Sequence, residues 1–155
     1  MSRKKRLQPP DVIILIADQF DEMEVVTCHS ALSNHQLSVV LVSIKPGLVQ
    51  SIHGITVHPD SYLSQELSLA SEKRQLIVLA GGETCAAQTL SDPRSHQLIQ
   101  DILQQNGFVA VMSRADYLVR ETGMFMLERE KGMMRQGEVE TAVFVQQLID
   151  RMNTN

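Results

Sequence analysis

The chain has 155 residues, enough for one domain with a sizeable core, and its 43% hydrophobic and 21% charged residues are ordinary for a globular protein. The net charge of −4 conceals a basic start, because Arg3–Arg6 holds four of the 14 basic residues and leaves 10 against 18 acidic ones elsewhere. An acidic body of this kind repels phosphate backbones, so nucleic acid is not an expected partner except through the basic start of the chain, which we expect to be a solvated arm.

The first ten residues are polar and basic and end in two prolines, so we expect Met1–Pro10 to be a disordered leader before a single domain over residues 11–153. The apolar run Val12–Ala17 is too short for a signal sequence or a membrane span, and we expect a cytoplasmic protein without a membrane partner. Cys28 and Cys85 show no metal-ligand spacing. The sequence therefore predicts no disulfide framework, no metal site and no cofactor.

A buried strand followed by an amphipathic helix is the first predicted unit. The strand covers Val12–Ala17, and either Asp18 or Asp21 can cap the helix. The apolar stripe of the helix consists of Val25, Cys28 and Leu32. Glu24 lies at the edge of that stripe, near the carboxyl end of the strand.

The middle of the chain predicts a second strand and a hairpin. Leu37–Ile44 is the strand, and the short runs Val49–Ile52 and Ile55–His58 form the two arms of the hairpin. The segment Ser61–Ser71 is expected to be weakly helical.

A third buried strand is predicted over Leu76–Ala80. It ends on two glycines, the second of which is Gly82, and these allow the backbone to turn tightly and approach a ligand closely. A short helix over Cys85–Leu90 follows. Asp92 and Pro93 then begin a further helix by the rules for caps and first turns.

A fourth buried strand over Phe108–Met112 leads into a sharp turn at Ser113 and a helix that Gly123 is placed to end. Ser113 has two interpretations. A serine at the start of a helix is a favoured N-cap. A hydroxyl held at such a corner is also beside free backbone amides and the positive end of a helix dipole, which stabilise a developing anion.

This order of strands and helices predicts an α/β fold, a three-layer sandwich with an open parallel sheet covered by helices on both faces. Ligand sites in such sheets lie beyond the carboxyl ends of the strands. Residues 18–24, the glycines at 81 and 82, and Ser113 should therefore meet at one edge. A carboxylate, backbone donors and a hydroxyl at one edge would suffice for acyl-transfer chemistry.

Five stretches also carry a family resemblance: ILIADQFDEMEVVT, IHGITVHPD, IVLAGGETCAAQTLSDP, GFVAVMSRADYLVRETGMF and GEVETAVFVQQLID. They resemble, in order, segments of the ThiJ/PfpI superfamily, a glutamine amidotransferase-like group that includes the parkinsonism-associated deglycase and intracellular protease-like proteins. The resemblance covers nearly the whole chain from Val12. It implies a flavodoxin-like sheet.

The resemblance also implies a set of site residues. The acidic partner of the family falls on Glu24, its oxyanion-hole glycine on Gly82 and its reactive cysteine on Ser113, while the amide of Arg114 would be the second oxyanion donor. The chain is a shortened and divergent member, because the thiol is absent and only 13 residues separate Gly123 from Gly137. No histidine follows residue 96, so the histidine used by many members is missing.

Three classes of function remain after these losses. A serine hydroxyl attacks only with the help of an adjacent general base, and Glu24 is the candidate, although a carboxylate is a weak base unless burial raises its pKa. The first expectation is a catalytically degenerate protein that acts through binding or assembly. The alternative is a hydrolase or deglycase-like enzyme that uses Ser113 with Glu24, and a small-molecule binding module is a third class.

A homodimer is the expected assembly. The segment Met124–Met134 is rich in methionine and phenylalanine but too short for the additional strands of the family, so part of the core or sheet edge would be left uncovered. Many members of the family also form dimers. A small-molecule ligand is the other expected partner.

Overall fold

The computed structural model describes residues 9–64, 71–121 and 132–154. Most of the predicted leader, part of the helix expected over Ser61–Ser71, and Gly123 at the expected end of the last helix lie outside these ranges. Most of the methionine-rich segment Met124–Met134 lies outside them too.

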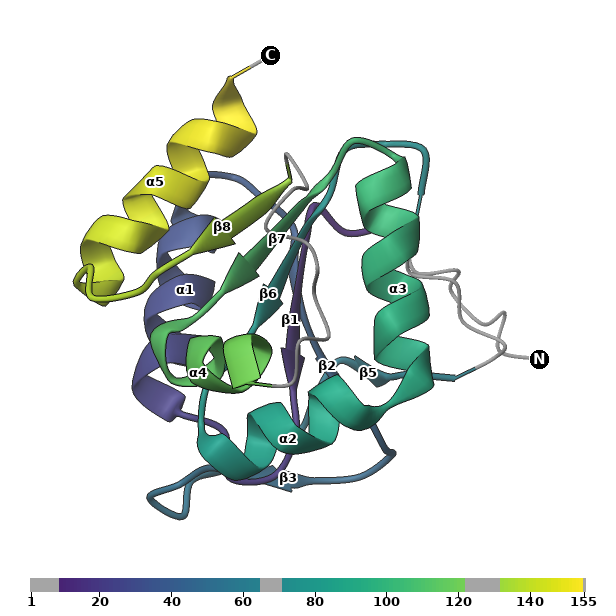
Figure 1. Ribbon diagram of the computed structural model, residues 1–155, viewed down its shortest axis with the longest axis vertical. Coiled ribbons are helices and arrows are strands. Elements are labelled where there is room, and N and C mark those ends of the chain that lie inside the picture. Colours follow the sequence, from purple (N-terminus) through teal and green to yellow (C-terminus); the bar gives the residue numbers. More distant parts are fainter. Residues whose placement is uncertain (1–8, 65–70, 122–131, 155) are drawn as a thin grey trace.

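A six-stranded sheet forms the centre of the molecule, and its described strand pairs are all parallel (Figure 1). The strands are β1 (Val12–Ile16), β2 (Val39–Ser43), β5 (Ser61–Tyr62), β6 (Leu76–Leu79), β7 (Phe108–Val111) and β8 (Met133–Arg135), in the spatial order β5-β2-β1-β6-β7-β8. The four strands that the sequence predicts, β1, β2, β6 and β7, all lie in this one sheet.

Helices cover both faces of the sheet and make it a three-layer, flavodoxin-like α/β sandwich (Figure 1). On one face α1 (Glu22–Asn34) packs beside α5 (Thr141–Asn153). On the other face α2 (Glu83–Ser91) packs against both α3 (Pro93–Gln104) and α4 (Ser113–Glu121).

Alternation along the central strand divides the core into two parts. Ile14 and Ile16 of β1 pack with α1 and α5, whereas Ile13 and Leu15 pack with α2, α3 and α4. All four side chains are fully buried. A central strand buried on both faces needs apolar residues at consecutive positions, which is why the strand appears in the sequence as an unbroken run.

The helix expected from Ser61 is wrong at its start. Ser61 and Tyr62 form β5, which pairs in parallel with β2. Asp60 fixes this course, because its side chain accepts a hydrogen bond from the amide of Leu41 and its own amide donates to the Leu41 carbonyl. Two such bonds align the chain with the edge of the sheet, and this tertiary contact overrides a weak helical pattern.

The predicted hairpin is confirmed as β3 (Val49–Gln50) paired antiparallel with β4 (Thr56–Val57). It is tied to the loop after β1, since the amide of Gln19 donates to the Gln50 carbonyl and the amide of Ile52 donates to the Phe20 carbonyl.

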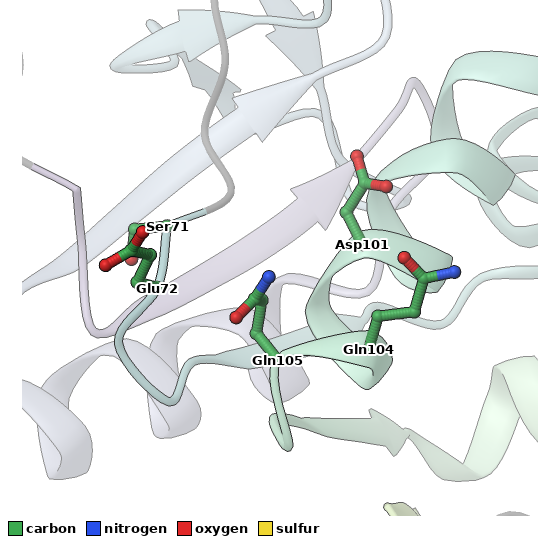
Figure 2. A pocket seen from close by; sticks show the side chains of 5 residues that line it. All are labelled: Ser71, Glu72, Asp101, Gln104 and Gln105. Carbon is green, nitrogen blue, oxygen red and sulfur yellow. The ribbon is translucent and has the colours of Figure 1, made fainter.

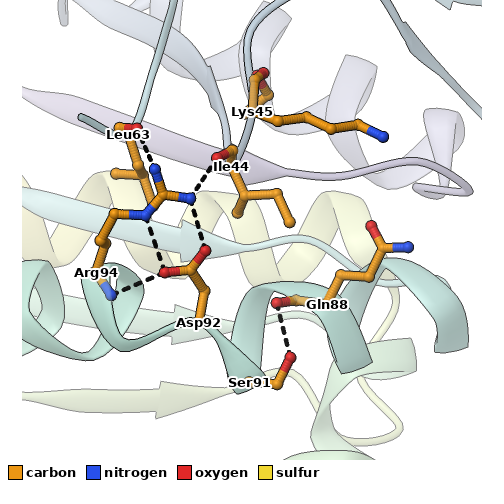
Figure 3. Close-up of polar contacts among 8 residues, drawn as sticks. Ile44, Lys45, Leu63, Gln88, Ser91, Asp92 and Arg94 are labelled. Atoms are coloured by element: carbon orange, nitrogen blue, oxygen red, sulfur yellow. Dashed lines mark hydrogen bonds and ion pairs between the residues drawn. The ribbon is translucent and has the colours of Figure 1, made fainter.

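The helix predicted to begin at Asp92 and Pro93 is α3, and Asp92 caps it by accepting a hydrogen bond from the amide of Arg94. The Arg94 side chain pairs with Asp92 and donates to the carbonyls of Ile44 and Leu63 (Figure 3). This arginine therefore ties the start of α3 to the end of β2 and to the segment after β5.

No helix among the described residues is both long and apolar enough to cross a membrane.

Candidate active site

The carboxyl ends of β1, β6 and β7 lie at one edge of the sheet, where α1, α2 and α4 begin (Figure 1). This is the edge at which the sequence predicts a site. It brings the side chain of Glu24, on the first turn of α1, against the backbone at Gly81 and Arg114. Parallel strands place these segments together although they are far apart in the chain.

Asp21, not Asp18, caps α1. Its carboxylate accepts hydrogen bonds from the amides of Met23 and Glu24 at 3.0 and 3.2 Å. Its own amide donates to the Gly81 carbonyl at 2.8 Å and so ties the start of α1 to the loop after β6. Asp18 instead accepts from the amide of Gln50 at 3.0 Å and so holds the hairpin.

The Glu24 carboxyl group is buried, and the residue is only 5% exposed. Neither carboxylate oxygen forms a hydrogen bond with the described residues, although the amides of Arg114 and Gly81 are directed at the group. Burial and the neighbouring Asp21 carboxylate raise the pKa of Glu24 to about 7, and those two amides only partly oppose the rise.

The two glycines after β6 have different roles. A Cβ atom at Gly81 would collide with Oε1 of Glu24 and with Cβ of Arg114, so Gly81 is the glycine that touches the acid. Gly82 has a φ of +101°, and a Cβ atom there would collide with the carbonyl oxygen of Gln19. Gly82, the oxyanion-hole candidate, therefore makes the turn into α2 and packs on the loop after β1.

Ser113 is the first residue of α4 and is exposed. It does not cap the helix, because the amides of Ala115 and Asp116 donate to the Met112 carbonyl and the Ser113 hydroxyl accepts no hydrogen bond from the described residues. The capping interpretation is therefore wrong. The Ser113 amide donates to Oε1 of Gln136 at 2.8 Å.

Gln136 is a residue that sequence reasoning missed. It follows β8, is 4% exposed, and donates from Nε2 to the Val139 carbonyl at 2.9 Å and to the Thr141 hydroxyl at 3.0 Å. A single buried amide thus joins the turn at Ser113 to the start of α5. The sequence carries no signal for this role, since a polar residue after a short apolar run is equally typical of a surface turn.

Arg114 links α4 to α1. Its Nε donates to Oδ2 of Asp21 at 3.1 Å, while its side chain remains 65% exposed. The amide of Arg114, the candidate second oxyanion donor, is directed at Glu24.

Among the described residues, the two cysteines do not provide an alternative nucleophile, and His53 does not provide a base for Ser113. Burial raises the pKa of both Cys28 and Cys85 to about 12, so their thiols stay protonated. His53 donates from Nδ1 to Oε1 of Glu22 at 2.5 Å, which holds it on the hairpin. No group of three metal-ligating side chains occurs in the described part of the chain.

A pocket of about 260 Å³ lies at the opposite edge of the sheet, between the segment before β6 and the end of α3 (Figure 2). Its lining residues are Ser71, Glu72, Asp101, Gln104 and Gln105. The nucleophile candidate and this pocket therefore belong to different ends of the molecule.

Comparison with known proteins agrees with this architecture. The sequence model of the DJ-1/PfpI family matches residues 10–135. No curated protein matches the chain.

Among solved structures the chain is similar to oxidized DJ-1 of Toxoplasma gondii, with 16% identity, a TM-score of 0.78, and coverage of 93% of this chain and 91% of that one. It is also similar to a mutant of a DJ-1 superfamily protein from Salmonella typhimurium, with 18% identity, a TM-score of 0.74, and coverage of 92% and 90%. It is similar to Drosophila melanogaster DJ-1beta as well, with 16% identity, a TM-score of 0.73, and coverage of 94% of this chain and 91% of that one. At such identities the structures show a shared fold.

Proposed function

The chain belongs to the DJ-1/PfpI family, and from that membership we propose that it is a catalytically inactive member that acts through binding or assembly in the cytoplasm. The fold alone does not carry this proposal, because one fold hosts many functions. The support comes from the groups around Ser113, Glu24 and Arg114.

One observation carries the proposal: the Ser113 hydroxyl has no base behind it. Neither oxygen of Glu24 forms a hydrogen bond with a described residue, and Ser113 is therefore not paired with it. A serine hydroxyl needs such a partner to lose its proton as it attacks. By the family resemblance Ser113 also stands where a cysteine would, and a thiol reaches its reactive form near neutral pH far more readily.

The candidate oxyanion donors support the same proposal. Of the two candidates, the Arg114 amide is directed at the Glu24 carboxyl group, and Gly82 lies in the turn into α2 against the carbonyl oxygen of Gln19. The Ser113 amide, which precedes that of Arg114, donates to Gln136. An oxyanion hole works through donors that point at one unoccupied position where charge develops. Here acceptors from the protein itself face the amides of Ser113 and Arg114.

The alternative is a hydrolase or deglycase-like enzyme with Ser113 as nucleophile and Glu24 as base. One observation favours it: the pKa of Glu24 is raised to about 7, within the range in which a carboxylate becomes an effective general base. This function requires the Glu24 carboxylate and the Ser113 hydroxyl to come within hydrogen-bond distance during binding, since they form no hydrogen bond here.

Covalent labelling separates the two proposals. The native protein and Ser113→Ala are treated with a serine-reactive acylating probe, and the labelled residue is identified by mass spectrometry. The inactive protein gives no adduct at Ser113. A stoichiometric adduct at Ser113 in the folded native protein, absent from Ser113→Ala, would establish an activated hydroxyl and overturn the proposal.

The variant Ser113→Cys tests which part of the site was lost. If the nucleophile is the only missing part, the new thiol has a depressed pKa and reacts with iodoacetamide at neutral pH. We expect instead a thiol of ordinary reactivity, because the amides that would stabilise its charge face Gln136 and Glu24. The free cysteines Cys28 and Cys85 are buried and do not interfere.

Assembly is the second part of the proposal. Met133 and Met134, the described end of the methionine-rich segment, pack in part against the two halves of the core. Other large apolar side chains remain exposed, among them Met23 at 70% and Val26 at 59%, one turn apart on α1. Exposed apolar surface of this kind supports a homodimer, and a small-molecule ligand at the Ser113 edge remains part of the proposal.

A further inference from the structure

Three charged or chargeable side chains meet at the edge beside Ser113: Asp21, Glu24 and Arg114. The Arg114 guanidinium pairs with Asp21 at 3.1 Å, and the Arg114 amide is directed at Glu24. Asp21 and Glu24 are 9% and 5% exposed. One arginine therefore faces two buried carboxyl groups through two different atoms.

These groups cannot all be charged without cost. A buried carboxylate is stable only when it is paired or hydrogen-bonded, and Asp21 has both kinds of partner whereas Glu24 has neither among the described residues. With Glu24 protonated the cluster is neutral. With Glu24 ionised the cluster carries one net negative charge, and the nearest cation to compensate it is already shared with Asp21.

We propose that Asp21, Glu24 and Arg114 form a proton-operated switch that sets the charge and geometry of the turn carrying Ser113. When Glu24 holds a proton, Arg114 pairs with Asp21 alone. When the proton leaves to solvent, the new carboxylate draws the Arg114 amide and guanidinium toward itself. Because Arg114 follows Ser113 directly, this movement changes the position of Ser113.

The other described groups around Glu24 cannot neutralise the charge of its carboxylate. Gly81 closes one side, since Oε1 already occupies the space where a side chain at residue 81 would begin. Cys28, one turn along α1, and Cys85 on α2 are the titratable groups from the packed elements, and the pKa of each thiol is raised to about 12. On α4, Asp116 is paired with Arg120 and Arg135.

The raised pKa of Glu24, about 7, supports switching near neutral pH. The two neighbouring charges shift this pKa in opposite directions, since the Asp21 charge raises it and the Arg114 charge lowers it. The inference concerns the same site as the proposed function and rests on that function in this respect alone. It does not depend on turnover by the protein.

Nuclear magnetic resonance tests the switch directly. The signals of the Arg114 Nε–H group and the Ser113 amide are followed from pH 5 to pH 9 in the native protein. We expect both to move with one shared midpoint near pH 7. In Glu24→Gln, which keeps the shape of the side chain, neither signal should titrate in this range.

Two further variants should move the midpoint of the Ser113 amide in opposite directions. Asp21→Asn keeps a capping side chain but removes the negative charge, so the midpoint should fall by about one pH unit. Arg114→Gln removes the cation, so the midpoint should rise by about one unit. This pair tests the proposal even if Glu24→Gln does not fold.

The proposal is overturned if the native signals are flat, if they still titrate in a folded Glu24→Gln, or if both neighbouring variants move the midpoint the same way. Turnover by the protein would contradict the proposed function but would leave these signals unchanged, so the two failures are distinguishable.

Discussion

At the scale of single residues, Glu24 is a buried carboxyl group at the edge beside Ser113. Its position on the first turn of α1 follows from the sequence pattern, since it lies beside the stripe of Val25 and Cys28 that packs on the sheet. Its raised pKa does not, because burial by Gly81 and Arg114 depends on segments that are distant in the chain. A sequence pattern predicts the position of a carboxyl group on its helix, but it does not predict which distant residues bury that group.

Glu24 should make stability fall as pH rises. Its pKa is about 7 in the folded protein and near the ordinary 4.5 when unfolded, so between these values the native state holds a proton that the unfolded state releases. The free energy of unfolding should therefore decrease from pH 5 to pH 8, by at most about 3 kcal/mol from this group.

Urea denaturation at pH 5 and pH 8 measures this effect in the native protein and in Glu24→Gln. The amide variant cannot ionise and should lose less stability over the same interval. Equal losses in the two proteins would show that Glu24 is not the group responsible.

At the scale of secondary-structure elements, the buried strands are the predictable part. The strands β1, β2, β6 and β7 are covered on both faces and appear as apolar runs, whereas β5 and β8 have two and three residues and are too short to form a pattern. Their places are fixed by contacts, such as the bonds between Asp60 and Leu41. Local sequence therefore identifies the centre of the sheet better than its edges.

Topology also predicts which loops meet at the site, because the carboxyl ends of parallel strands share an edge. It does not resolve which atoms touch. Gly81, not Gly82, lies against Glu24, and Ser113 bonds through its amide to Gln136 rather than capping α4. These contacts depend on the side chains of Glu24 and Gln136, whose positions relative to the distant loops no local pattern predicts.

Gln136 should be a strong determinant of stability. In Gln136→Met the Ser113 amide loses its acceptor, and the Val139 carbonyl and Thr141 hydroxyl lose their donor. We expect the free energy of unfolding to fall by about 2–4 kcal/mol, because unpaired polar groups in a buried site cost about 1–3 kcal/mol each.

Gln146→Met is the matched control, since Gln146 makes one exposed hydrogen bond with Asp150 on α5. Its unfolding free energy should change by no more than about 0.5 kcal/mol. Guanidinium denaturation measures both variants. Equal small effects would contradict the role of Gln136 as a junction.

At the scale of the whole molecule, the fold is that of the DJ-1/PfpI family, and a fold of this kind does not by itself determine function. The family fold has been kept although the edge beside Ser113 lacks a paired nucleophile and base among the described residues. Met23 and Val26 remain exposed on α1, and the proposed homodimer would cover them.

The mass in solution tests association. One chain has a mass of 17.3 kDa, so a homodimer should give about twice this value by light scattering at tens of micromolar protein. Buried apolar area gives the association its driving force, and we expect little change in mass with added salt. A mass of one chain at these concentrations would contradict the dimer.

Turnover measures the central claim most directly. The purified protein and Ser113→Ala, each confirmed as folded by denaturation, are assayed side by side with activated esters, amides and glyoxals. We expect neither protein to exceed the uncatalysed background, because the Ser113 hydroxyl lacks a partnered base and the amides of Ser113 and Arg114 face Gln136 and Glu24. Turnover by the native protein that disappears in folded Ser113→Ala would contradict the account and establish Ser113 as a nucleophile.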